Sequence, residues 1–338
     1  MKNISEDIKN SIINTLNVNL NYKPGETVAI ILQLWDPKFD PSFKVLFDKS
    51  QELCEVMYQV FKENNIDVKL LCYKPEIARN GVDTSQQVYD NIGNTDIIFM
   101  PTAFSLSHTD FRKQQTEKGS RIASIPTFTL EMFEKEGPMN IDYTEMEQRT
   151  NEIAEKMKNC KFIRVTGDET DIIIEIDNTT THSATGLLKE KSQWGNLPGA
   201  EAYAVPTHLG NSHGYFTVPI NWGGQKPLKH KAKFLIKQGR FTDIVGENIE
   251  AQEYIDKEIK PLFTQENHDI LAEIGIGTNK NIDEDFLKKF SWSILTAEKI
   301  HGSAHFANGN SSSMGGKNNV PVHIDWVVPN VEIEYLNS

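Results

Sequence analysis

The sequence contains few cysteines, no excess of positive charge and no long apolar run. Its three cysteines, Cys54, Cys72 and Cys160, form no C-x-x-C pair, which argues against a disulfide framework or a thiolate zinc site and favours a reducing compartment. Lys and Arg number 35 and Asp and Glu 47, a formal net charge of −12. This balance argues against a nucleic-acid-binding surface and a polybasic membrane anchor. No stretch approaches about 18 consecutive apolar residues, so no transmembrane helix is expected. We therefore expect a soluble cytoplasmic protein that binds neither nucleic acid nor membrane.

A glycine-rich phosphate-binding loop is also missing, although the first half of the chain has the pattern of an α/β domain. Residues 27–34, 68–73 and 96–100 are short, apolar and rich in β-branched side chains, as buried strands are. Residues 44–64 have the apolar spacing of a helix between two of these strands. Alternating strands and helices predict a doubly wound, mostly parallel sheet over about residues 20–135. Without G-x-G-x-x-G or a Walker motif, nucleotide binding is not expected.

The length of 338 residues predicts about two domains. A helix expected over residues 142–159 joins the two halves, and a hairpin expected at 162–176 opens the second half. We predict an N-terminal Rossmann-like α/β domain over residues 1–140. A C-terminal mixed α/β domain that binds metal and carries the catalytic site is predicted over residues 141–338.

His108 follows the predicted strand at residues 96–100, at the edge of the sheet where open α/β sheets bind ligands. Two roles are open for it. It either caps the helix expected at residues 110–118 or belongs to a functional site.

The second half contains acidic and histidine side chains in apolar surroundings. His323 and Asp325 stand two residues apart in an apolar segment, so on a strand both side chains point to the same face. Glu273 has only apolar residues or glycine around it. Burying such groups costs several kcal/mol unless they are paired or bind a cation. A His–Asp pair and an Arg or Lys partner for Glu273 are the structural alternatives to a metal site.

Glu201 and His305 are further candidate ligands. Glu201 follows a Pro-Gly turn among small residues, where a surface acid is the alternative. His305 leads into a stretch of small residues that would let a substrate approach. His301 lies four residues earlier, but Gly302 and the absence of H-E-x-x-H disfavour a zinc-binding helix, and we expect His301 to be an ordinary residue.

Two glutamates, two histidines and an aspartate suit two divalent ions better than one. We therefore predict two metal ions per chain bound by Glu201, Glu273, His305, His323 and Asp325. Imidazole and carboxylate ligands without thiolate suit Zn, Co, Mn or Fe(II). The chemistry that such a site supports is activation of a bound water for attack on a carbonyl group.

These segments resemble the aminopeptidase T family of metallopeptidases. The similarity is carried in the first half by residues 23–28, 105–109 and 119–126, and in the second half by residues 196–201, 272–279, 304–309 and 323–325. The resemblance implies a two-metal site with the five ligands named above, a homodimer, and removal of an N-terminal residue from peptides. It also implies that Glu201 or a neighbour assists the attacking water.

The sequence departs from these peptidases in one respect that concerns the reaction. The family carries a Tyr a few residues after the His-x-Ala-x-Gly string, whereas residues 310–314 here contain none. Losing a group that stabilises developing charge can cost about 10²–10³ in rate. The chain also looks shorter than typical members.

The sequence more distantly resembles the ring-opening 2,5-dihydroxypyridine dioxygenases. That resemblance implies one Fe(II) bound by two histidines and an aspartate. His323 and Asp325 would supply two of the ligands, and the third histidine of that family falls at Glu273. Its acid–base residues would correspond to His108, Glu201 and His213. The main prediction is a hydrolase that cleaves an amide bond of a small peptide or amino-acid conjugate, with the dioxygenase as the alternative. A binder that only kept the fold is a further alternative.

Overall fold

The computed structural model describes residues 4–224, 226–289 and 293–337. Contacts divide the chain into two compact units, one made of Met1–Tyr143 with Gly186–Gly199 and the other of Thr144–Thr185 with Ala200–Ser338. The boundary predicted from the sequence places residues 186–199 in the second domain. Within this stretch, strand β8 (Trp194–Asn196) pairs in parallel with a strand of the first unit.

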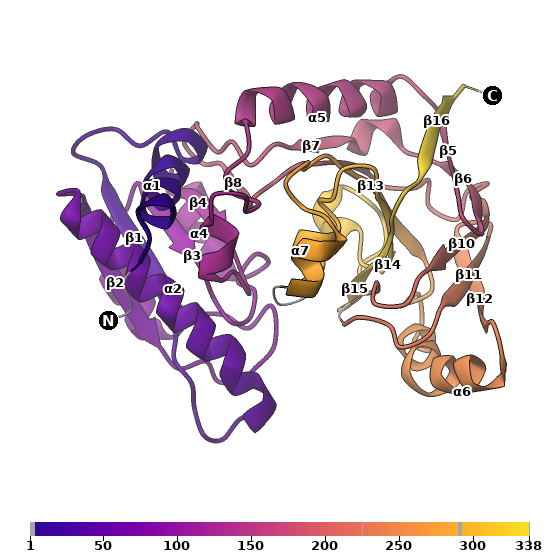
Figure 1. The fold of residues 1–338 in the computed structure, drawn as a ribbon, viewed down its shortest axis with the longest axis horizontal. Coiled ribbons are helices and arrows are strands. Elements are labelled where there is room, and N and C mark those ends of the chain that lie inside the picture. The colour runs from indigo at the N-terminus through magenta and orange to yellow at the C-terminus, as the bar shows by residue number, and fades with distance from the viewer. Residues whose placement is uncertain (1–3, 225, 290–292, 338) are drawn as a thin grey trace. The chain divides into compact units, whose positions relative to one another are not determined.

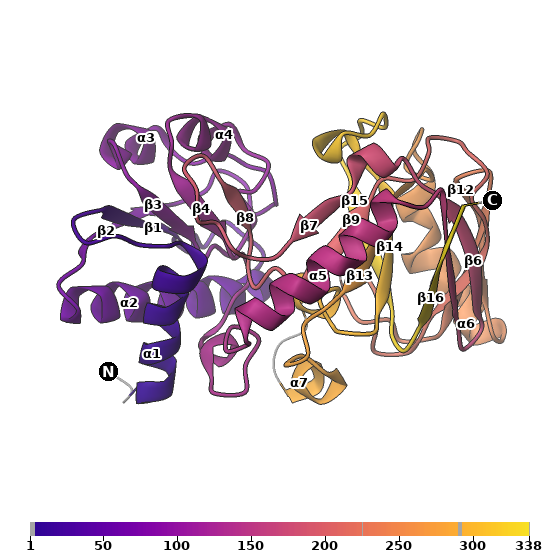
Figure 2. The ribbon, with the colours of Figure 1, turned by 90° about the horizontal axis from the view of Figure 1, so that it is seen from above.

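The first unit is a doubly wound sheet, as the sequence predicted. Its strands lie in the order β2-β1-β3-β4-β8 and all their pairings are parallel. Helices α3 and α4 cover one face, and α1 and α2 cover the other (Figure 2). The elements are β1 (Thr27–Gln33), β2 (Asp67–Tyr73), β3 (Ile97–Met100), β4 (Arg121–Ser124), α1 (Glu6–Asn14), α2 (Lys44–Glu63), α3 (Gln86–Ile92) and α4 (Asp110–Glu117). Because both faces are covered, the central strands β1 and β3 are apolar almost throughout.

The second unit consists of two antiparallel sheets with helices at their margins (Figure 1). One sheet has the strand order β12-β11-β10-β6-β5-β16 and the other β15-β14-β13-β9-β7. The six-stranded sheet contains β5 (Phe162–Gly167), β6 (Thr170–Glu175), β10 (His213–Val218), β11 (Ala232–Lys237), β12 (Arg240–Gly246) and β16 (Glu332–Leu336). The five-stranded sheet contains β7 (His182–Ala184), β9 (Glu201–Ala204), β13 (Leu271–Gly277), β14 (Ala304–Gly309) and β15 (His323–Val328). The helices are α5 (Tyr143–Lys158), α6 (Ile249–Glu258), α7 (Glu284–Lys289) and α8 (Ile294–Ala297).

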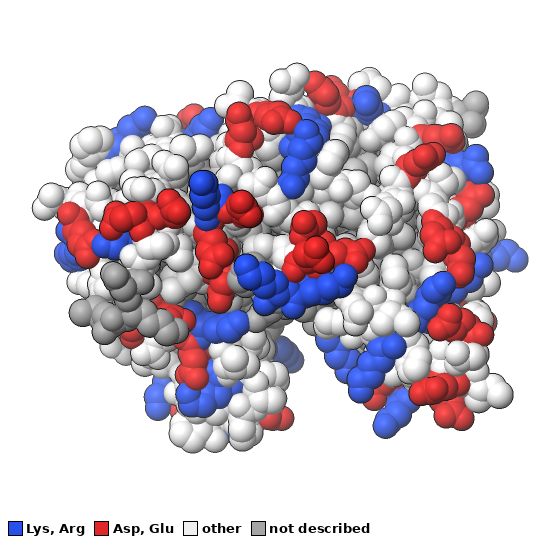
Figure 3. Space-filling view, in the orientation of Figure 1, with Lys and Arg blue, Asp and Glu red and all other residues white. Residues whose placement is uncertain are grey.

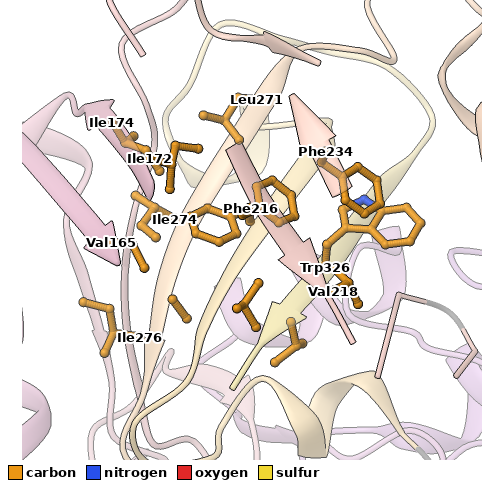
Figure 4. Packing of buried hydrophobic residues seen from close by; sticks show 14 of the residues in the cluster. Val165, Ile172, Ile174, Phe216, Val218, Phe234, Leu271, Ile274, Ile276 and Trp326 are labelled. Atoms are coloured by element: carbon orange, nitrogen blue, oxygen red, sulfur yellow. The ribbon is translucent and has the colours of Figure 1, made fainter. Parts of the chain in front are cut away.

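The core of the second unit lies between these two sheets (Figure 4). Phe216 of the six-stranded sheet stacks on Phe306 of the five-stranded sheet, with ring centroids 4.3 Å apart. Ile274 and Ile276 of β13 belong to the same buried cluster. Successive side chains of a strand point to opposite faces. Gly275, which lies between these two isoleucines, and Glu273, which precedes them, therefore lie on the opposite face of the five-stranded sheet.

None of the helices that the structure describes combines the length and the apolarity needed to cross a membrane. On the face drawn in Figure 3, Lys and Arg side chains alternate with Asp and Glu side chains rather than gathering in one area.

Candidate metal centre

The register of four neighbouring strands brings the predicted ligands to one face of the five-stranded sheet. Ala307 of β14 lies opposite Glu273 on one side and Asp325 on the other. Gly275 lies opposite His305, and Gly277 lies opposite Glu201. Small residues thus alternate with ligand residues across the strands. This arrangement leaves room on the sheet for five polar side chains to converge.

Glycine at position 275 is required by the ring of His305. A Cβ built on residue 275 would lie 2.1 Å from both Cε1 and Nε2 of His305, a distance that no real contact allows. The imidazole therefore lies across the glycine, with its Nε2 atom directed to the carboxylates. Gly277 is required for a similar reason: a Cβ on residue 277 would lie 2.2 Å from the carbonyl oxygen of Ile300.

Glu273 is the centre of the cluster. Its Oε1 lies 3.3 Å from Nε2 of His305 and its Oε2 lies 3.2 Å from Nε2 of His323. His323 Nε2 is also 3.2 Å from Asp325 Oδ1, and His305 Nε2 is 3.6 Å from Glu201 Oε2. One carboxylate thus contacts both histidines, so Glu273 is the residue that the two histidines share.

The five predicted side chains form two overlapping groups of ligand atoms that share Glu273. The first group is Glu273, His323 and Asp325, and the second is Glu201, Glu273 and His305; within each, the ligand atoms lie within 4.8 Å of one another. Such spacing suits a divalent cation bound by oxygen and imidazole nitrogen.

Unsatisfied polar atoms and ring orientation support the fit to a metal ion. Glu201 Oε2 and Asp325 Oδ1 are buried and accept no hydrogen bond within the described residues. His323 Nδ1 lies 2.7 Å from the carbonyl oxygen of Asn310. A proton on Nδ1 donated to this carbonyl leaves the lone pair of Nε2 free, which is the usual support for a metal-binding histidine. The residues present therefore fit a divalent metal ion.

Sequence reasoning missed two buried charged residues at this site, Glu298 and Lys299. Glu298 forms a third group of ligand atoms with His305 and Asp325, again within 4.8 Å. The Nζ of Lys299 forms ion pairs with Glu201 and with Glu298, the latter at 2.7 Å. Among the described residues Glu273 has no Arg or Lys partner, because the buried lysine pairs with the two other glutamates and Glu273 contacts the two histidines. Adjacent Glu and Lys are also common on exposed helices, so their sequence gave little sign of burial.

In this cluster, burial and nearby opposite charges shift the pKa values of the side chains in opposite directions. Burial raises the pKa of Glu273, but hydrogen bonds from His305 and His323 outweigh it and hold that pKa well below its usual range. Burial lowers the pKa of His305, yet Glu273, Glu298 and Glu201 together raise it to about 9. Burial, with Asp325 and Glu201 nearby, raises the pKa of Glu298 to about 7 even though Lys299 lowers it. Without a metal ion, protons and the lysine supply the positive charge that balances the carboxylates.

The remaining predicted residues are not members of the ligand groups found among the described residues. His108 belongs to the first unit, where its ring meets Trp194 edge to face and Thr109 rather than His108 caps α4. His213 starts β10 of the six-stranded sheet, is exposed, and places Nδ1 2.7 Å from the Asn211 carbonyl oxygen. His301 lies in an exposed turn and is absent from the three ligand groups of the described residues. Catalytic roles for His108 and His213 remain predictions.

A family model describes nearly the whole chain. The NicX model, 2,5-dihydroxypyridine 5,6-dioxygenase, matches residues 19–335. The chain belongs to this family. The match favours the second of the two resemblances in the sequence over the aminopeptidase. No curated protein sequence matched the chain.

Solved structures agree on the fold of this NicX-family chain. The 2,5-dihydroxypyridine dioxygenase of Pseudomonas putida KT2440 superimposes with a TM-score of 0.74 at 15% identity, covering 98% of this chain and 95% of that one. Wild-type AmpT of Thermus thermophilus gives a TM-score of 0.59 at 11% identity, with the same coverage. At these identities the likeness concerns the fold. The lower TM-score of AmpT indicates a more distant likeness of fold.

Proposed function

We propose that this protein is a metal-dependent dioxygenase that opens the ring of a dihydroxylated aromatic heterocycle with molecular oxygen. The observation that carries the proposal is the convergence of Glu273, His323 and Asp325 on one face of the sheet, in a chain of the NicX family. Three ligands on one side of an ion leave positions open for a substrate and oxygen, as in the facial sites of non-haem Fe(II) oxygenases. When bound, Fe(II) supplies the electron that triplet oxygen needs to react with a ring.

The protein's own residues would hold and orient the ion. His323 is fixed through the Asn310 carbonyl, and Glu273 is fixed by contacts with both histidines. The donor set differs from two histidines and one carboxylate, because Glu273 adds a second carboxylate. The donor set of this chain therefore carries one more negative charge than a set of two histidines and one carboxylate. The proposed function applies to a site with this additional charge.

The test is oxygen consumption by protein loaded anaerobically with Fe(II), using 2,5-dihydroxypyridine as the first substrate. We expect oxygen uptake in step with loss of the ring's absorbance. His323→Ala is expected to abolish uptake and reduce bound metal, while His301→Ala, the same substitution outside the cluster, leaves both intact. Iron-loaded protein that consumes no oxygen with any dihydroxylated pyridine would contradict the proposal.

A two-metal hydrolase is the second candidate, because Glu201, Glu273 and His305 form another ligand group sharing Glu273. In that function Glu201 would pass a proton to the leaving amine. Release of amino acids from short peptides without oxygen, by protein holding about two Zn²⁺ or Mn²⁺ per chain, would favour this candidate.

A further inference from the structure

Lys299 is a buried cation within a cluster of carboxylates. Its side chain is 1% exposed, and its Nζ pairs with one oxygen of Glu201 and one oxygen of Glu298. A buried ammonium is tolerated only where opposite charges compensate it. The two glutamates provide that compensation, and Glu201 is at the same time a member of the second ligand group.

A local backbone arrangement holds this lysine in place. The amide of Lys299 donates to Thr296 O at the end of α8, and its carbonyl accepts from the amide of Asn279. Gly277 allows the close approach, because a Cβ there would lie 2.7 Å from the carbonyl carbon of Lys299. The ammonium is thus fixed beside β13 and β9 rather than carried on a mobile surface segment.

The lysine and a second metal ion would compete for the same carboxylate. Paired ions in two-metal sites lie about 3.5–4 Å apart and need carboxylate or imidazole ligands at about 2.0–2.2 Å. Lys299 already engages Glu201 Oε1, so a second dication on Glu201 Oε2 would lie beside a fixed positive charge. Repulsion between such charges is poorly screened in a buried site.

We propose that the ammonium of Lys299 takes the place of a second metal ion and limits the cluster to one divalent cation, bound by Glu273, His323 and Asp325. The inference rests on the proposed function only in requiring an ion at these three residues. Lys299 is a positioning residue in this proposal, since it acts on the metal count through Glu201. The predicted pair of ions is thereby replaced by one ion and one lysine.

The test is the number of metal ions bound by Lys299→Met. Protein is equilibrated with excess Mn²⁺ or Zn²⁺, desalted and analysed for metal. We expect about one ion per chain in the native protein and about two in K299M, as in two-metal sites. The double variant E201Q/K299M lacks the carboxylate of the second group and is expected to return to one ion. Lys280→Met removes an exposed lysine that pairs with Glu145 and is expected to leave the count unchanged.

Electron paramagnetic resonance of Mn²⁺-loaded native protein tests the inference without any variant. An isolated Mn²⁺ signal supports it, whereas an exchange-coupled pair in the native protein overturns it. A folded K299M protein that binds only one ion also overturns it, as does native protein that binds none. One ion in the native protein and two in K299M support the inference even if no ring compound is cleaved, and that result would refute the proposed reaction alone.

Discussion

Replacing Glu273 by Gln tests the centre of the cluster. The substitution keeps the side chain's shape and removes the charge that both histidines contact at 3.2–3.3 Å. A hydrogen bond to a charged group contributes about 1.5–3 kcal/mol, so losing two gives roughly 3–6 kcal/mol. Removing one partner of a buried ion pair costs about 3–5 kcal/mol, which agrees. We therefore expect E273Q to destabilise the metal-free protein by about 4 kcal/mol at pH 6, where His305 is charged.

The assay is thermal unfolding of metal-free protein at two pH values. For a unit of 150–250 residues, 1 kcal/mol shifts Tm by about 2–4 °C, so E273Q should lower Tm by about 8–16 °C at pH 6. The difference should shrink above pH 9, the region in which His305 loses its proton. Glu145→Gln is the matched control: Glu145 also contacts two cations, Arg149 and Lys280, but is exposed, and its loss should cost less than about 1 kcal/mol. An unchanged Tm for E273Q at pH 6 would refute the reasoning.

Three further predictions concern the same unit and the thiols. The pKa of His305 is raised to about 9, against 6.5 for a free imidazole. Protonated His305 therefore stabilises the metal-free protein fully below pH 6.5, and this stabilisation is lost as the pH rises to 9. Chemical denaturation across this pH range measures the loss. Gly275→Ala should displace the ring of His305, because its Cβ would lie 2.1 Å from Nε2; altered titration of this imidazole by NMR would show it, and an unmoved resonance would contradict it. Replacing Cys54, Cys72 and Cys160 together by Ser should preserve metal content and turnover, since no thiol belongs to the ligand groups of the described chain.

Much of the metal centre could be predicted from single segments. Asp325 and His323 stand out because a strand places positions i and i+2 on one face, and apolar neighbours make a polar pair costly there. Glu273 stands out for the same reason. What these segments do not contain is the strand order, which depends on pairings between residues far apart in the chain. The structure supplies it through the register of β9, β13, β14 and β15.

The sequence could not reveal what balances the charge of these groups. Lys299 is separated from Glu201 by nearly a hundred residues, and its burial depends on the close approach that Gly277 permits. A lysine next to a glutamate has no local feature that distinguishes a buried ion pair from an exposed one. The return of β8 to the first sheet was missed for a similar reason, because Trp194–Asn196 is too short to show a strand pattern.

The composition of the donor set connects the lysine to the choice of metal. Glu273 and Asp325 together would balance the charge of one bound dication, and His323 would add a neutral nitrogen. Glu201 and Glu298 carry the remaining negative charge, which Lys299 partly balances. A second dication in addition to Lys299 would bring five positive charges against the four carboxylates of the cluster, an excess of positive charge in a buried environment. Charge balance therefore favours one hard or borderline ion with an oxygen-rich donor set, such as Mn²⁺ or Fe²⁺, and it makes Lys299 the residue whose removal should change that balance first.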